Sequence, residues 1–218
     1  MLRVISLAAF CSMASMRVCD PMLVSLAREF SVTTGDASAV IAAFAVSYGV
    51  LQLFYGPLGD RLGKVRVVIG ATFACALFSG VTALAPTLPV LVAARAAMGA
   101  SAAGIIPLSM AWIGDNVPYE QRQETLAQLM VATVSGMMAG QWFGGFAVEA
   151  LGWRAAFVVL SLLFLTAASL LWRQARAMAA STPTPAAGSA VPPAFSLSAY
   201  LANTAALLRM PRVRWVLT

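Results

Sequence analysis

The sequence contains very little charge and no histidine. Only 10% of its 218 residues are Asp, Glu, Lys or Arg, whereas 61% are apolar, and the mean hydropathy is +0.85. Soluble domains carry about 25% charged residues, because charged side chains cover a surface that faces water. This shortage excludes soluble, fibrous and disordered classes and indicates an integral membrane protein. The absence of histidine excludes His-dependent catalytic triads, zinc-protease sites and histidine-ligated haem.

Cysteine is scarce as well. Cys11, Cys19 and Cys75 all fall in apolar stretches. The spacing of these thiols and their expected burial are typical of inert side chains rather than of a disulfide framework or a metal site. We therefore expect no metal and no cofactor.

Apolar runs predict an all-α polytopic protein with six membrane-spanning helices and short loops. A span needs about 20 predominantly apolar residues. The predicted spans cover residues 4–26, 38–55, 67–86, 89–111, 125–148 and 154–172. The first run passes through Arg17 and Asp20 and is followed by no small-x-small cleavage site, so we expect a retained span rather than a signal peptide.

The cationic side chains are distributed unevenly among the loops. With the N-terminus inside, only Arg28 and Arg154 fall in outer loops. The predicted cytoplasmic segments hold Arg3, Arg61, Lys64, Arg66, Arg122, Arg173, Arg176, Arg209, Arg212 and Arg214. This positive-inside bias predicts that both termini are cytoplasmic and that the protein lies in the cell (inner or plasma) membrane. It also accounts for the net charge of +6 without a nucleic-acid partner.

The composition changes after the sixth predicted span. Residues 1–172 form the predicted six-helix bundle, and residues 173–208 are predicted to be a cytoplasmic linker rich in Ala, Pro, Ser and Thr. In residues 209–218 a basic run leads into Trp215 and apolar residues. This pattern is typical of the entry to a seventh span, so we expect the chain to be the first half of a longer protein.

The most informative segment joins the second and third predicted spans. It contains Gly56, Gly59 and Gly63 around the pair Asp60-Arg61. Glycine permits positive φ and close helix approach. A charge at the membrane edge is costly without a partner, so a partner is expected nearby. A basic loop that only determines topology is the alternative interpretation.

The spacing in this loop resembles the signature of the major facilitator superfamily of secondary transporters, G-x-L-x-D-R-x-G-R/K. Here it is Gly56, Leu58, Asp60, Arg61, Gly63 and Lys64. The resemblance covers essentially the whole chain, as the N-terminal six-helix half of a drug:proton antiporter-like protein. It implies that Asp60 and Lys64 form a charge network with Asp115, which Arg122 follows, and that this network locks the outward-facing state. Lys64 keeps the charge of the commoner Arg but loses its bidentate fork.

Three charged residues lie inside predicted spans, namely Arg17, Asp20 and Arg95. Asp20 and Arg95 are each about six residues from the outer end of their span, so both lie roughly 9 Å below it and a pair is geometrically possible. Arg17 is three residues before Asp20 on the same helix face. One interpretation is a static ion pair, and the other is a carboxylate whose proton affinity changes when its cationic partner moves.

The superfamily resemblance extends to the fourth predicted span. The signature L-x-x-x-R-x-x-Q-G appears as Leu91, Arg95, Met98 and Gly99, with Met98 in place of Gln. The resemblance implies that Arg95 takes part in proton coupling. It also implies that the first and fourth spans line a central substrate cavity.

Further candidate positions lie in the second span. Tyr48, Gln52 and Tyr55 share one helix face at spacing i, i+4, i+7. Contact with substrate is one interpretation of this face, and interfacial anchoring explains Tyr55 equally well.

The fifth span has small residues at every fourth position. They are Gly136, Gly140 and Gly144, followed by Gly145. This spacing favours close helix packing. It also resembles the family's antiporter motif, G-P-x-x-G-G, with Gln141 in place of Pro, so Gln141 is a candidate hydrogen-bonding group in the cavity. Gly152-Trp153-Arg154 resembles the family's usual interfacial anchor.

The resemblance implies a secondary active transporter and not an enzyme. Our leading hypothesis is proton-coupled efflux of small organic compounds or drugs by alternating access. There are three alternatives: a metabolite or sugar uptake permease, a non-transporting membrane sensor, and a half-transporter that pairs with its own copy. The expected partners are a small-molecule substrate, protons, the lipid bilayer and the C-terminal half of the same protein.

Overall fold

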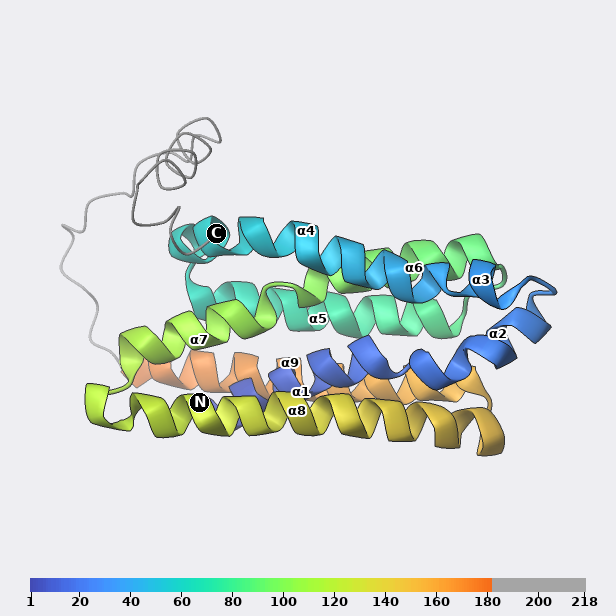
Figure 1. Ribbon diagram of the computed structural model, residues 1–218. Helices are drawn as coiled ribbons and strands as arrows, with labels where there is room; N and C mark the ends of the chain where they lie inside the picture. Colours follow the sequence, from blue (N-terminus) through green and yellow to red (C-terminus); the bar gives the residue numbers. More distant parts are fainter. Residues whose placement is uncertain (182–218) are drawn as a thin grey trace, which may run out of the picture. The chain divides into compact units, whose positions relative to one another are not determined.

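The computed structural model describes residues 1–181, and every regular element in that part of the chain is a helix (Figure 1). The elements are α1 (Leu2–Arg17), the 3₁₀ turn η1 (Asp20–Met22), α2 (Leu23–Glu29), α3 (Thr34–Ala37), α4 (Ala39–Leu62), α5 (Lys64–Ala83), α6 (Leu88–Ala102), α7 (Ile105–Asn116), α8 (Tyr119–Ala150) and α9 (Trp153–Ser181). The predicted entry to a seventh span and most of the predicted linker lie outside the described residues.

Helices of membrane-spanning length occupy all six predicted positions in the described part of the chain. Five stretches are both long and apolar enough to cross a membrane: Leu2–Glu29, Thr34–Leu62, Lys64–Ala83, Leu88–Asn116 and Trp153–Ala180. The remaining helix, α8, is long enough, but its glycines and polar side chains lower its hydropathy. The last helix continues past Trp172 to Ser181, so the predicted linker begins with helix.

The turn between α4 and α5 is a single residue. Gly63 adopts φ +89°, a conformation that residues with a Cβ rarely take, and it separates Leu62 from Lys64. At the other end of α4, Thr33 and Asp36 form a reciprocal capping box that starts α3. The end of α4 and the start of α3 are therefore explained by local sequence.

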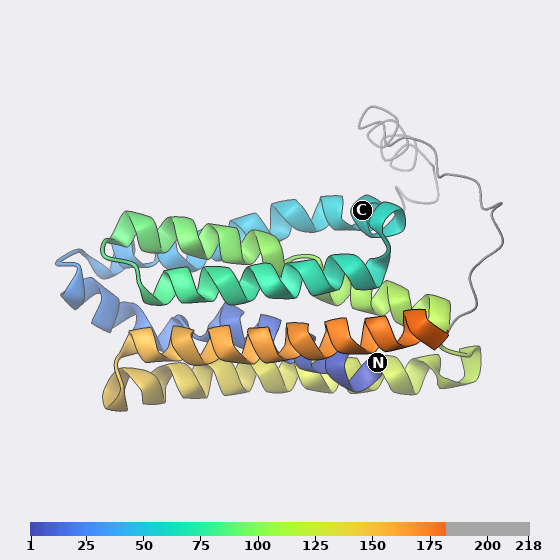
Figure 2. The same ribbon diagram turned by 180° about the vertical axis from the view of Figure 1, so that it is seen from behind.

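The helices lie in two groups that are visible from both sides (Figures 1 and 2). One group contains α4, α5 and α6, and the other contains α1, α8 and α9. The tightest pairings within the groups are α4 with α6 and α1 with α8, while α5 packs on α9 and joins the groups. The remaining long helix, α7, follows α6 and packs mainly against α5.

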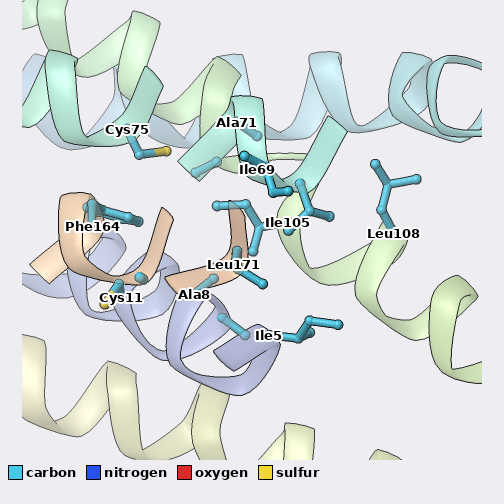
Figure 3. Close-up of a cluster of buried hydrophobic side chains, with 14 of the residues drawn as sticks. Ile5, Ala8, Cys11, Ile69, Ala71, Cys75, Ile105, Leu108, Phe164 and Leu171 are labelled. Carbon is cyan, nitrogen blue, oxygen red and sulfur yellow. The ribbon is translucent and has the colours of Figure 1, made fainter. Parts of the chain in front are cut away.

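The larger buried core consists of apolar side chains from α1 and from α4 to α9, and Figure 3 labels some of those on α1, α5, α7 and α9. Cys11 of α1, Cys75 of α5, Ile105 of α7 and Phe164 of α9 are all completely buried. In a bilayer such packing is stabilised by van der Waals contact rather than by exclusion of water. All three cysteines are free and buried, as predicted.

Candidate functional site

A charge cluster lies at the end of the bundle that contains Gly63, which we call the Lys64 end. The ammonium group of Lys64 forms an ion pair with the carboxylate of Asp115. Its Nζ atom is also 3.9 Å from Oδ1 of Asp60. One lysine thus links the ends of α4, α5 and α7, and the three charges that the resemblance grouped together meet in the structure.

The helix dipoles oppose all three of these charges. Asp60 lies in the last turn of α4 and Asp115 in the last turn of α7, where the dipole is negative. Lys64 is the first residue of α5, where the dipole is positive. Each unfavourable placement costs about 0.3–1 kcal/mol at an exposed helix end. The cluster is therefore held by mutual attraction against the local helix fields.

The other predicted residues of this loop differ in their surroundings. Arg61 lines a surface hollow of about 640 Å³ together with Asp60, Lys64 and Asp115. Arg122 lies apart from the charge cluster, because its Nε donates to the carbonyl oxygen of Val117, 2.9 Å away, across the turn into α8. Arg122 is therefore not part of the ion-pair cluster in this structure, and its assignment to the switch loop stays a prediction.

The glycine that permits close approach is Gly59. A Cβ there would lie 2.4 Å from the side chain of Leu108 in α7, whereas one at Gly56 would meet nothing within 4 Å. The close approach of α4 and α7 thus depends on Gly59, which the sequence pattern did not distinguish from Gly56.

Among the three charged residues inside the spans, Asp20 pairs with Arg17 and not with Arg95. Nη1 of Arg17 donates to Oδ2 of Asp20 at 3.1 Å. Among the described residues, Asp20 and Arg95 form no ion pair; Nη1 of Arg95 instead donates to the carbonyl oxygen of Ser15 at 2.9 Å. Asp20 thus pairs with Arg17, the neighbour expected at i−3 on the same face, and the possible pair with Arg95 is not formed in this structure.

Arg95 is completely buried in an aromatic setting. Its guanidinium carbon is 4.3 Å from the ring centroid of Phe44 and 5.8 Å from that of Phe157. Within the described structure its Nε and Nη2 atoms have no protein acceptor. Met98, which replaces the family's Gln, places its sulfur 3.6 Å from Nη1. The direct contacts of the Arg95 guanidinium group are thus with two aromatic rings, one carbonyl oxygen and one thioether sulfur.

The candidate face of α4 is only partly accessible. Tyr48 is half-buried and stacks on Phe44 with ring centroids 6.0 Å apart, while Gln52 is exposed. Tyr55 is half-buried and turns its hydroxyl group to α6. Gln141, on α8, is exposed next to the buried Gly140.

Three of the four glycines in α8 are steric requirements for its packing on α1. A Cβ at each would lie within 2.3 Å of a backbone oxygen of α1. The pairs are Gly136 with Phe10, Gly140 with Ala14 and Gly144 with Val18. A Cβ at Gly145 would have its nearest neighbour, Cβ of Pro21, at 3.8 Å, which is ordinary contact. The packing interpretation of this motif is thus confirmed for three positions.

At the opposite end of the bundle, Glu29 joins helices that sequence patterns did not connect. Its carboxylate accepts a hydrogen bond from Nε1 of Trp153 and an ion pair from Arg154. Arg154 also donates to the carbonyl oxygen of Ala85, 3.2 Å away. This clamp ties the end of α2 to the start of α9 and to the turn after α5. The sequence pattern indicated Trp153 and Arg154 as an interfacial anchor. It did not indicate that Glu29 would be their partner.

Comparison with known proteins places the chain in a family. The sequence model of the Major Facilitator Superfamily matches residues 5–218. This chain belongs to the Major Facilitator Superfamily. The match covers nearly all of the sequence, including the loop and the spans whose motifs are described above.

Curated relatives in the superfamily include several named for drug export. The chain is 28% identical over 145 residues to multidrug resistance protein D of Escherichia coli, covering 66% of this chain and 36% of the relative. It is 25% identical over 169 residues to the multidrug export protein EmrB of Haemophilus influenzae, covering 78% and 33%. It is 32% identical over 132 residues to the multi-drug resistance efflux pump PmrA of Streptococcus pneumoniae, covering 60% and 33%. The chain therefore spans about a third of the length of these relatives.

Within the superfamily fold, each six-helix half consists of two three-helix repeats. The first helix of each repeat in this chain is interrupted. The first span breaks between α1 and α2, at Asp20 and Pro21, and the fourth breaks between α6 and α7, at Ala103 and Gly104. Interrupted helices in corresponding positions of two repeats are the best structural pointer to a transporter's binding site.

Proposed function

We propose that this chain is the N-terminal half of a proton-coupled secondary transporter that exports small organic compounds by alternating access. Membership of the superfamily supports transport. The names of three relatives, which describe multidrug export or resistance, support export of small organic molecules. The bias of Lys and Arg toward the Lys64 end supports a cytoplasmic position for that end.

The observation that carries the proposal is the charge cluster of Asp60, Lys64 and Asp115. Its three charges stand at the helix ends that disfavour them, so the cluster contributes little to static stability. Exposed or half-exposed ion pairs also contribute only about 0–1 kcal/mol, and the side chain of Asp60 is 73% exposed. Such a cluster is suited to a contact that forms in one conformation and separates in another. We assign it to the outward-facing state, where it closes the cytoplasmic end.

The proposed proton and substrate region lies deeper, around the two interrupted spans. Asp20 is partly accessible and paired with Arg17, whose side chain is 45% exposed. Both lie at the break of the first span, while Arg95 is buried next to the same helix at Ser15. Gln52 and Gln141 add exposed hydrogen-bonding groups on α4 and α8, and Tyr48 adds an aromatic ring. We propose that Asp20 binds and releases the coupling proton and that the polar side chains contact substrate.

The proposal is tested by removing one charge from the cluster without changing its shape. Full-length protein with Asp60→Asn is reconstituted in sealed liposomes with an imposed pH step, and uptake of a panel of small organic dyes is followed. We expect the wild type to accumulate dye and the variant to be slower by about fivefold or more, since conformational coupling energies are typically 1–3 kcal/mol. Glu149→Gln, an exposed acid on α8, is the matched control and should transport normally. Normal transport by Asp60→Asn would contradict the switch.

The second candidate function is uptake rather than export, and one observation favours it. Gln141 stands where the antiporter pattern has Pro, on a face of α8 that is exposed beside the packed glycines. The same liposomes distinguish the two directions. Export predicts that dye moves against the proton flow, and uptake predicts that both move together, as reported by a pH-sensitive fluorophore inside the vesicles.

A further inference from the structure

The fourth span is bent where α6 ends and α7 begins. The turn Ala103–Gly104 separates the two helices, and Pro107 follows in the first turn of α7. Proline has no N–H group, so the carbonyl of Ala103 loses the donor that an unbroken helix would supply. In a bilayer a break of this kind is tolerated only where neighbouring side chains or helices satisfy the backbone groups that it frees.

The break also ends α6 at Ala102, so carbonyl groups in its last turn lose their intrahelical donors, and Tyr55 of α4 contacts two of them. Its hydroxyl oxygen is 3.0 Å from the carbonyl oxygen of Ala100 and 3.2 Å from that of Ser101, so it donates to the last turn of α6. Its ring covers the turn itself. A Cβ at Gly104 would lie 2.1 Å from Cδ1 of Tyr55, so only glycine leaves room for the ring. An interfacial anchor would instead direct its hydroxyl group to the headgroup region.

The whole of α7 is docked on the hairpin of α4 and α5. Tyr55 contacts its beginning, the side chain of Leu108 fits against Gly59 in its middle, and Asp115 pairs with Lys64 at its end. All three contacts come from one hairpin, so the bend at Gly104 and the ion pair at the far end of α7 are held by the same pair of helices.

We propose that Tyr55 is a positioning residue that sets the angle between α6 and α7 and thereby couples the bend of the fourth span to the Asp60–Lys64–Asp115 cluster. The hydroxyl group holds the bent form, and the ring seats against Gly104. Its part in a transport cycle rests on the proposed function. The positioning role itself is a property of the resting protein and is measured without transport.

The first experiment uses hydrogen exchange of full-length protein in lipid nanodiscs. Tyr55→Phe keeps the ring and removes the hydroxyl group. We expect exchange of the backbone amides of residues 104–106 and 108 to become about threefold to tenfold faster, the effect of one lost hydrogen bond, with other spans unchanged. Tyr119→Phe removes a hydroxyl group from an exposed position at the start of α8 and should leave exchange in residues 104–108 at the wild-type rate. Wild-type exchange in Tyr55→Phe would overturn the proposal.

A second variant keeps the proposal testable if Tyr55→Phe does not fold. Gly104→Ala places a methyl group where the ring of Tyr55 lies and should accelerate the same amides. Gly114→Ala, in the same helix, meets nothing within 4 Å and should not. Equal exchange in the two alanine variants would overturn the proposed role of the ring.

A transport measurement separates this proposal from the proposed function. In liposomes, Tyr55→Phe should lower the turnover number by about fivefold, the scale of a typical conformational coupling, while substrate affinity stays at the wild-type value. A loss of affinity with normal turnover would make Tyr55 a substrate contact and overturn the positioning role. If the wild type moves no dye in either direction, the proposed function fails, while the exchange experiment still decides whether Tyr55 holds the bend.

Discussion

Lys64 is the residue on which the charge cluster depends. It is the only member of the cluster whose side chain is mostly buried, with 21% exposed against 73% for Asp60 and 56% for Asp115. Its ammonium group faces two carboxylates from different helices. Removal of Lys64 therefore leaves two acids close together at helix ends that disfavour them.

We predict energetic coupling between Lys64 and Asp115. In a double-mutant cycle of Lys64→Met and Asp115→Asn, thermal unfolding in detergent should show a coupling free energy of about 0.5–1 kcal/mol, as expected for a partly exposed ion pair. The cycle of Lys64→Met with Glu149→Gln should be additive, since Glu149 lies in the last turn of α8. Strict additivity in the first cycle would mean that these charges act only on topology.

At the scale of elements, α1 and α8 show how a glycine motif in one helix fits against the backbone of another. Glycines four residues apart on α8 meet backbone oxygens four residues apart on α1. This spacing follows from the helical repeat, which returns to the same face about every four residues. Close backbone approach provides the van der Waals contact that holds helices together in a bilayer.

We predict that Gly140→Ala destabilises the protein. A Cβ there would lie 2.2 Å from the carbonyl oxygen of Ala14, so the two helices have to separate, at a cost of about 1–3 kcal/mol. Gly145→Ala is the matched control in the same helix. Its Cβ would be at ordinary contact distance, and the higher helix propensity of alanine should make it neutral or slightly stabilising. Thermal unfolding in detergent measures both, and equal stability of the two variants would contradict this account.

At the scale of the whole molecule, one interrupted span carries the proposed proton site and the other leads to the charge cluster. The break in the first span places Asp20 beside Arg17, and Pro21 of the same break lies against Gly144 of α8. The break in the fourth span leads through α7 to Asp115 and Lys64. Movement at either break therefore has a packed route to other helices, as a two-state rocking motion requires.

We predict that Asp20→Asn abolishes accumulation against a gradient but spares substrate binding and passive exchange. Asn cannot take up and release a proton, so flux loses its link to the pH difference. The measurement is dye accumulation in liposomes with an imposed pH step, together with equilibrium binding. Asp36→Asn removes an acid from the capping box at the start of α3 and should accumulate dye normally. Uphill transport by Asp20→Asn with normal pH dependence would place the coupling site elsewhere.

The sequence by itself determined the class of the protein, the positions of its membrane-length helices and its family. These features depend on local composition and spacing. Apolar runs specify spans because a bilayer excludes charge. Gly63 marks the turn because few other residues adopt its φ, and Gly136, Gly140 and Gly144 share a face because the helical repeat requires it.

Only the tertiary structure decided which of these residues meet. Arg95 contacts the carbonyl oxygen of Ser15, whereas Asp20 pairs with Arg17. Glu29 reaches Trp153 across 124 residues of sequence, and the hydroxyl group of Tyr55 contacts the α6 carbonyls at the bend. Such contacts depend on the crossing of helices and on where a helix breaks. Spacing along one helix defines a face, but the partner of that face is chosen by the packing of the other helices.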